Sequence, residues 1–180
     1  LALGWGLGQY RFHNYRATPP APINRLVIPT GVHTQRLIGQ LRGIYLCRDL
    51  INQPSNHMTP AALEVAMVAL TKSYNAKLKT HRGKKLESGF PAIHTVGRAA
   101  EIMPRLMDLR WGKTGPKITL IGKGITFDSG GLDLKPSKAM EMMKKDMGGA
   151  ATVLGLAAAL MESSIDIQLR VLVAAAENAV

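Results

Sequence analysis

Apolar side chains recur at three- and four-residue intervals in two stretches of the first half of the chain. Residues 32–51 show this spacing and predict a long amphipathic helix. Thr59 followed by Pro60 supplies a helix N-cap and a first-turn proline, and the apolar run behind them predicts a second helix that ends near Tyr74. Residues 18–29 contain four prolines, which predict an extended linker in front of both helices.

The second half alternates strand-like and helix-like stretches. Strands are predicted at residues 76–80, 92–96, 106–111, 117–121 and 169–175, a short helix or loop at 81–89, and a buried helix at 150–161. The last units run strand, glycine-rich loop, helix, strand, which is typical of a parallel crossover. The sequence therefore predicts an α/β fold with three α/β/α layers around a largely parallel or mixed central sheet.

The first residues form a separate segment in this interpretation. Residues 1–16 carry three glycines in an apolar setting, followed by aromatic residues, and are expected to include the tail of a helix that enters the domain. We assign residues 1–29 to an entry segment with its proline-rich linker and residues 30–180 to the domain itself. Because the chain opens with Leu1 and shows no signal peptide, we expect it to be part of a longer protein.

Composition narrows the class of protein. Apolar residues make up 46% of the 180 residues, enough for a real core, whereas only 5% are aromatic, which leaves few platforms for stacking nucleic-acid bases. No uninterrupted apolar run approaches the roughly 18 residues of a membrane-spanning helix. The single cysteine, Cys47, excludes an internal disulfide framework and suits a reducing compartment, so a cytoplasmic location is expected.

The net charge of +11 is concentrated in the first hundred residues, where thirteen Lys and Arg face three acids, against ten and nine in the remainder. A basic half of this kind suits nucleic acid or an anionic surface. Its charges are scattered among apolar residues, however, and no zinc-finger, RNP or basic-helix pattern accompanies them. A solvated face balanced by acids elsewhere in a longer protein is the favoured interpretation, and a nucleic-acid-binding module remains an alternative.

Polar and glycine residues cluster between residues 122 and 150, where a strand is predicted to end, which is where ligands bind in open α/β sheets. Neither phosphate-loop glycine pattern occurs there, and Ser129 lacks the G-x-S-x-G setting of a serine hydrolase. The five histidines are dispersed along the chain, which disfavours imidazole ligation. Asp128 and Asp146 are hard carboxylates suited to a divalent zinc, manganese or magnesium ion, so a metal centre with oxygen ligands fits best.

The same stretch closely resembles the signature region of the leucine aminopeptidase family, the cytosolic dinuclear-metal aminopeptidases also called M17. About thirty contiguous positions carry Lys123, Asp128, Lys135 and Asp146 at offsets of 0, 5, 12 and 23 residues. Weaker similarity extends to residues 9–12, 49–54 and 177–178. The resemblance implies a zinc-peptidase-like catalytic domain of which this chain is the N-terminal part, incomplete at its C-terminal end.

The resemblance also implies a role for each residue. Lys123 is expected to bind a metal through its neutral amine, Asp128 to bridge two divalent ions, and Asp146 to bind the more loosely held ion. Lys135 is expected to stay charged, polarise the scissile carbonyl and stabilise the oxyanion that develops. Met143 is expected to line the pocket for the first side chain of the substrate, although an ordinary core methionine is an almost equal alternative.

The activity implied is release of N-terminal residues, leucine and similar ones, from peptides with a free amino terminus, in a homo-oligomer that the family suggests is a hexamer. The family's further ligands lie in an Asn-Thr-Asp-Ala-Glu-Gly-Arg motif that these 180 residues do not contain. We therefore expect the chain alone to be inactive, with Lys123 protonated and paired with Asp128 or Asp146. A relative that has lost catalysis and acts as a binding or scaffold protein is the remaining alternative.

Overall fold

The computed structural model describes residues 1–18 and 25–180. Its helices and strands follow one another in the order α1 (Ala2–Gly8), α2 (Thr34–Asn52), α3 (Pro60–Tyr74), β1 (Lys77–Arg82), α4 (Lys84–Gly89), α5 (Pro91–Gly97), β2 (Arg105–Trp111), β3 (Lys117–Asp128), α6 (Ser137–Met140), the 3₁₀ helix η1 (Met143–Met147), α7 (Gly148–Glu162) and β4 (Gln168–Asn178).

A four-stranded sheet in the order β1-β2-β4-β3 lies at the centre of the described residues. β3 and β4 are parallel, and β1 and β2 join them in antiparallel pairs, so the sheet is mixed. Helix α7 lies between these two parallel strands in sequence, as the predicted crossover requires. The predicted α/β class and the mixed sheet are both confirmed.

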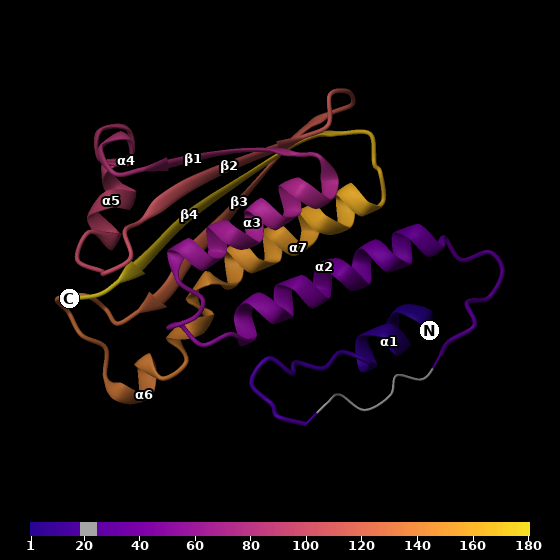
Figure 1. Cartoon of the computed structure of the whole chain (residues 1–180), viewed down its shortest axis with the longest axis horizontal. Helices are drawn as coiled ribbons and strands as arrows, with labels where there is room; N and C mark the ends of the chain where they lie inside the picture. The colour runs from indigo at the N-terminus through magenta and orange to yellow at the C-terminus, as the bar shows by residue number, and fades with distance from the viewer. Residues whose placement is uncertain (19–24) are drawn as a thin grey trace.

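Helices cover the two faces of the sheet unequally (Figure 1). α3 and α7 pack on one face, α2 packs on α7 further out, and α1 lies against α2. The other face is covered at one end only, where α5 contacts β4. Side-chain alternation along β4 divides its residues between the faces: Val173 and Ala175 are fully buried in the core, whereas Ala174 and Ala176 line a cavity together with residues of α5.

The core lies between the sheet and the helical layer. Most of its fully buried members come from α3, β2, α7 and β4, and Met147 of η1 joins them. The others include Leu63, Met67, Met107, Leu109, Leu154, Val171 and Val173. α3 begins as predicted, with the Thr59 hydroxyl accepting a hydrogen bond from the Ala62 amide at 3.2 Å. The sequence patterns therefore predicted α3, β2, α7 and β4, which supply most of this core.

Two predicted elements are wrong. Residues 92–96 form part of helix α5, not a strand, because Pro91 occupies the first turn of a helix that the β-branched residues behind it obscure. The glycine-rich stretch from Gly122 continues β3 as far as Asp128 instead of forming a loop. A Cβ atom at Gly122 would lie 2.7 Å from the Ala150 Cα, so this glycine serves a close contact between strand and helix.

The N-terminal segment is described in part. A helix occurs there as expected, over Ala2–Gly8, and residues 25–29 have no regular structure. The rest of the predicted linker includes residues 19–24, which lie outside the described residues, and the boundary at residue 29 stays a prediction. Among the helices described, none combines the length and the apolar character needed to cross a membrane.

Candidate metal and catalytic site

The candidate site lies where the parallel strands β3 and β4 end side by side. Asp128 stands opposite Asn178 in the strand register, and both line a cavity of about 450 Å³. Lys123 from β3 and Asp146 from η1 line the same cavity. Side chains that are 23 residues apart in sequence are thus brought to one edge of the sheet, as the sequence predicted for this position.

Lys123 and Asp128 share the cavity although five residues separate them along β3. Side chains in a regular strand alternate between faces, so an odd separation would place these two on opposite faces. A register shift between Ile125 and Phe127 introduces Thr126 as an extra residue in β3. This β-bulge returns Asp128 to the face that carries Lys123.

Both carboxylate oxygens of Asp128 are held by hydrogen-bond donors. Lys135 Nζ lies 2.7 Å from Oδ2, while Asn178 Nδ2 at 2.7 Å and the Gly130 amide at 3.0 Å donate to Oδ1. The bond from Lys135 is the largest influence and lowers the pKa of Asp128, the amide donors add to it, and partial burial opposes them. Asp128 is therefore a fixed, ionised carboxylate.

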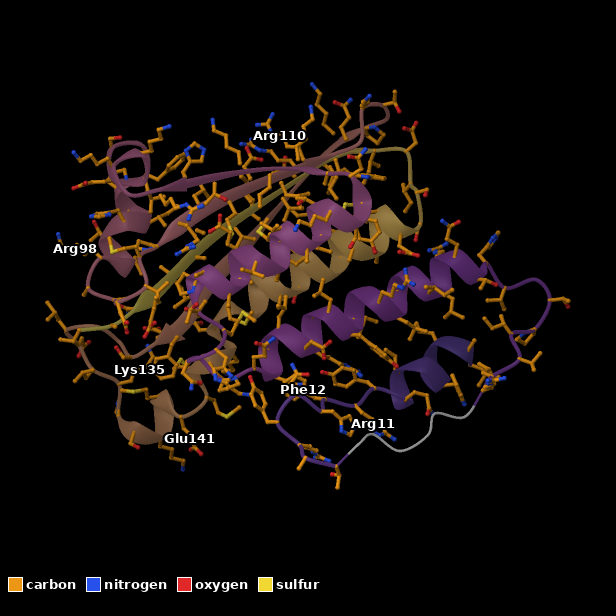
Figure 2. All side chains as sticks on the ribbon, in the orientation of Figure 1. Arg11, Phe12, Arg98, Arg110, Lys135 and Glu141 are labelled. Atoms are coloured by element: carbon orange, nitrogen blue, oxygen red, sulfur yellow. The ribbon has the colours of Figure 1, made fainter. Side chains whose placement is uncertain are left out.

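A tight loop returns Lys135 to Asp128. The Lys135 amide donates to the Ser129 carbonyl at 2.9 Å, which closes the loop, and Gly130 and Gly131 adopt positive φ angles of 96° and 67° inside it. A Cβ atom at Gly130 would lie 2.1 Å from the Asp133 carbonyl oxygen, so only glycine fits. Figure 2 shows Lys135 at the end of the molecule that carries α6.

Asp146 is positioned by a close approach of helix to strand. The N-terminal end of α7 follows η1 directly, and a Cβ atom at Gly149 would lie 3.1 Å from the Lys123 backbone nitrogen. Lys123 Nζ donates to Asp146 Oδ1 at 2.7 Å, so this lysine lies beside one of the two aspartates with which pairing was expected. Asp146 Oδ2 is buried and has no hydrogen-bond partner among residues 1–18 and 25–180.

This donor set fits a divalent metal. A buried carboxylate oxygen without a partner is costly, and a cation would satisfy it. Two carboxylates are ligands that zinc and manganese accept, and the lysine in the same cavity could join them only after its ammonium loses a proton. Within the described residues no cluster of three or more His, Cys, Asp or Glu side chains suits a metal, so a third ligand from this cavity would have to be the Lys123 amine.

One expected residue is not tested here, and one residue of the site was not expected. Met143 is half-buried in η1 outside the lining of this cavity, and its place in a substrate pocket stays a prediction. Asn178 was not assigned a role, although it donates to Asp128 and its backbone oxygen accepts from the Ser129 amide and hydroxyl. The feature that identifies Asn178 as a site residue is its position opposite Asp128 in the parallel strands β3 and β4. Helix α5 supplies an apolar wall through Ala92, Ile93 and Val96.

Comparison with known proteins shows the family of this chain. The model of the cytosol aminopeptidase family catalytic domain, Peptidase_M17, matches residues 45–180. The chain belongs to the cytosol aminopeptidase family. A probable cytosol aminopeptidase of Geobacter sp. (strain M21) is 35% identical over 187 residues, which cover 93% of this chain and 38% of that relative.

Solved cytosol aminopeptidase structures share the fold. The crystal structure of the cytosol aminopeptidase from Coxiella burnetii is 46% identical with a TM-score of 0.91, and the match covers 98% of this chain and 38% of that one. The bottromycin maturation enzyme BotP in complex with Mn is 32% identical with a TM-score of 0.90, over 99% of this chain and 39% of that one. This chain thus spans less than two fifths of these relatives.

Proposed function

We propose that this chain is part of the catalytic domain of a metal-dependent aminopeptidase that releases N-terminal residues, leucine and similar ones, from peptides through a dinuclear metal centre. The observation that carries the proposal is the convergence of Lys123, Asp128, Lys135 and Asp146 at one edge of the sheet, with one oxygen of Asp146 buried and unpartnered. Membership of the cytosol aminopeptidase family supports it.

Lys123, Asp128 and Asp146 would hold the metal, two divalent ions of zinc or manganese, with magnesium as a third candidate. When bound, such ions lower the pKa of a water molecule and polarise the carbonyl group of the substrate. The manganese in the solved BotP complex makes manganese the first ion to test.

The chain's own side chains provide orientation and charge. Asp128 is held by Asn178 and by the Gly130 amide, so its carboxylate keeps one orientation while Lys135 approaches the other oxygen. The Lys135 ammonium can donate a hydrogen bond to the carbonyl oxygen of the scissile peptide bond, where negative charge develops. Carboxylates at the cavity also accept hydrogen bonds from a charged α-amino group, which favours substrates with a free N-terminus.

The decisive experiment removes Lys135 from the full-length protein. Lys135→Ala is expected to lower the turnover of leucyl-p-nitroanilide by about 10²- to 10³-fold with metal content unchanged, because one preorganised donor to the oxyanion is lost. Lys138→Ala, three residues away on the exposed surface of α6, is the matched control and should leave turnover unchanged. Loss of metal from Lys135→Ala would show that its role is structural.

Asp128→Asn tests the metal assignment. The amide lacks the charge and one of the ligating oxygens, so elemental analysis should find less metal along with lost turnover. Full metal occupancy in this variant would contradict a bridging role for Asp128. We further propose that the full-length protein acts in the cytoplasm as a homo-oligomer, with a hexamer as the form to look for by light scattering.

A further inference from the structure

A chain of contacts ties the turn that carries Asp146 to the end of helix α2. Lys144 lies two residues before Asp146 in η1, and its Nζ donates to the Asn52 carbonyl at 3.0 Å. Asn52 is the last residue of α2, where backbone carbonyls have no partner within the helix. A cation is favoured at this end of a helix because the helix dipole is negative there.

The Asn52 side chain is held in turn by a hydrogen bond to Tyr10 from the N-terminal segment. Asn52 Nδ2 donates to the Tyr10 hydroxyl at 3.0 Å, and that hydroxyl donates to Asp49 Oδ1 at 2.7 Å. Burial, together with the bond to Asp49, raises the pKa of Tyr10 to about 12, so the phenol keeps its proton at neutral pH. The Tyr10 ring also packs edge-on against Tyr45, with centroids 5.0 Å apart.

The turn is anchored in the core at its C-terminal end by Met147, which is fully buried, and Lys144 supplies a side-chain hydrogen bond nearer its start. η1 is a 3₁₀ helix of five residues without a side-chain cap, and such turns have poorer hydrogen-bond geometry than an α-helix. Asp146 Oδ1 contacts Lys123, and Oδ2 has no partner among the described residues, so the position of the carboxylate depends on the backbone of the turn. Lys145, which lies between Lys144 and Asp146, is exposed and has no side-chain hydrogen bond within the part of the chain that the structure describes.

We propose that Lys144 is a positioning residue for Asp146: its bond to the Asn52 carbonyl holds the 3₁₀ turn so that the Asp146 carboxylate points into the metal site. The inference rests on the proposed function, since it assumes that Asp146 binds a metal. It assigns different tasks to two adjacent lysines, with Lys144 fixing the turn and Lys145 facing solvent.

Whether removal of the Lys144 side chain weakens or tightens metal binding distinguishes a positioning role from a purely electrostatic one. Removing a positive charge near a bound dication should tighten metal binding if charge alone matters. If Lys144 positions the turn, Lys144→Met should instead weaken binding, by about tenfold, the lower end of the range for residues that orient a ligand. Lys145→Met removes the same charge one residue away and should leave affinity unchanged or slightly higher.

The experiment measures Mn²⁺ affinity of the full-length protein by titration calorimetry, with the EPR spectrum of the bound ion as a second readout. Lys144→Arg retains a cationic donor and should restore affinity to within about threefold and return the wild-type spectrum. The melting temperature of the metal-free variants checks folding, and Lys144→Gln replaces Lys144→Met if the latter unfolds. Binding by the Lys144 variant that is as tight as that of Lys145→Met overturns the inference.

Asp146→Asn distinguishes this failure from a failure of the proposed function. If Asp146→Asn weakens Mn²⁺ binding and Lys144→Met does not, the positioning role alone is wrong. If Asp146→Asn leaves the affinity unchanged, Asp146 is not a ligand, and both the metal assignment and the inference fall.

Discussion

At the scale of single residues, the orientation of Asp128 depends on Asn178 as much as on Lys135. The Asn178 amide is 2.7 Å from Oδ1, at the same distance as the Lys135 ammonium from Oδ2. Asn178→Ala in the full-length protein is expected to weaken metal binding by about tenfold, as is usual for residues that orient a ligand. Titration calorimetry with Mn²⁺ measures the change.

Ser129→Ala is the matched control for this prediction. The Ser129 hydroxyl donates to the Asn178 backbone oxygen and accepts from the Gly131 amide, and it is not among the described donors to the Asp128 carboxylate. Its loss should reduce stability slightly and leave metal affinity within about twofold. Equal losses of affinity in both variants would assign the effect to the loop as a whole and contradict a specific role for the Asn178 side chain.

The sequence could identify some residues of the site and not others for a physical reason. Lys123, Asp128, Lys135 and Asp146 occur at spacings shared with a family, so their resemblance was visible in the printed sequence. Asn178 lies 50 residues from Asp128, and its role depends on which residues two parallel strands place opposite one another. That register follows from packing of the whole sheet and is absent from local sequence patterns.

At the scale of elements, α2 and α7 approach through two facing glycines. A Cβ atom at Gly43 would lie 2.2 Å from the Gly155 backbone oxygen, a contact that no side-chain movement can relieve. Gly43→Ala is therefore expected to lower the free energy of unfolding by about 1–3 kcal/mol or more, the usual effect of overpacking. Urea denaturation measures it.

Gly4→Ala provides a control of opposite sign. Gly4 is an exposed residue of α1, and a Cβ atom there would meet nothing within 4 Å. Alanine is favoured over glycine in a helix by up to about 1 kcal/mol, so this variant should be neutral or more stable. A stable Gly43→Ala protein would mean that the two helices separate at little cost.

Elements with long periodic patterns were predicted well, and short ones surrounded by tertiary contacts were not. α3 and α7 have uninterrupted apolar faces that fix both their type and their position. α5 has seven residues, too few for the helical period to outweigh its β-branched composition. Gly124 resembles a loop residue, yet a Cβ atom there would lie 2.6 Å from the Ala174 carbonyl of the neighbouring strand.

At the scale of the whole molecule, the folded stability of a chain with net charge +11 depends in part on a few acidic residues that are paired with arginine. Glu64 bonds Arg105 at 2.6 Å and Arg82 at 3.3 Å. Burial alone would raise the pKa of Glu64, but hydrogen bonds from Thr80 and Arg105 and the charges of both arginines outweigh it, and the pKa is lowered.

This lowered pKa predicts loss of stability in acid. Because the unfolded chain binds the proton of Glu64 more readily, the free energy of unfolding should fall once the pH drops below about 5 and continue to fall through the folded-state pKa. Melting temperatures between pH 7 and pH 3 measure the slope. Glu64→Gln should be less stable at pH 7 by about 3–5 kcal/mol, since Arg105 loses its buried partner, and should show a shallower slope. Parallel curves for the two proteins would contradict this prediction.

The 180-residue chain by itself is expected to release no leucine from leucyl-p-nitroanilide, even with added manganese or zinc. Its candidate ligands are Lys123, Asp128 and Asp146, and the Lys123 ammonium that bonds Asp146 competes with a metal for that carboxylate. Metal binding should accordingly be much weaker than in the full-length protein. Turnover by the purified, sequence-verified chain would mean that a partner chain supplies the remaining ligands.

Thr126 restricts how the length of β3 can change among relatives. This extra residue is 1% exposed, and its hydroxyl donates to the Ala176 carbonyl at 3.3 Å, so the bulge is filled and anchored. Insertion or deletion of one residue between Lys123 and Asp128 would turn the carboxylate toward the helix-packed face, whereas a change of two residues would not. Aligned relatives that bind metal here should therefore show gaps of even length, or none, in this interval. A relative with a single-residue gap must have moved its bulge or abandoned the site.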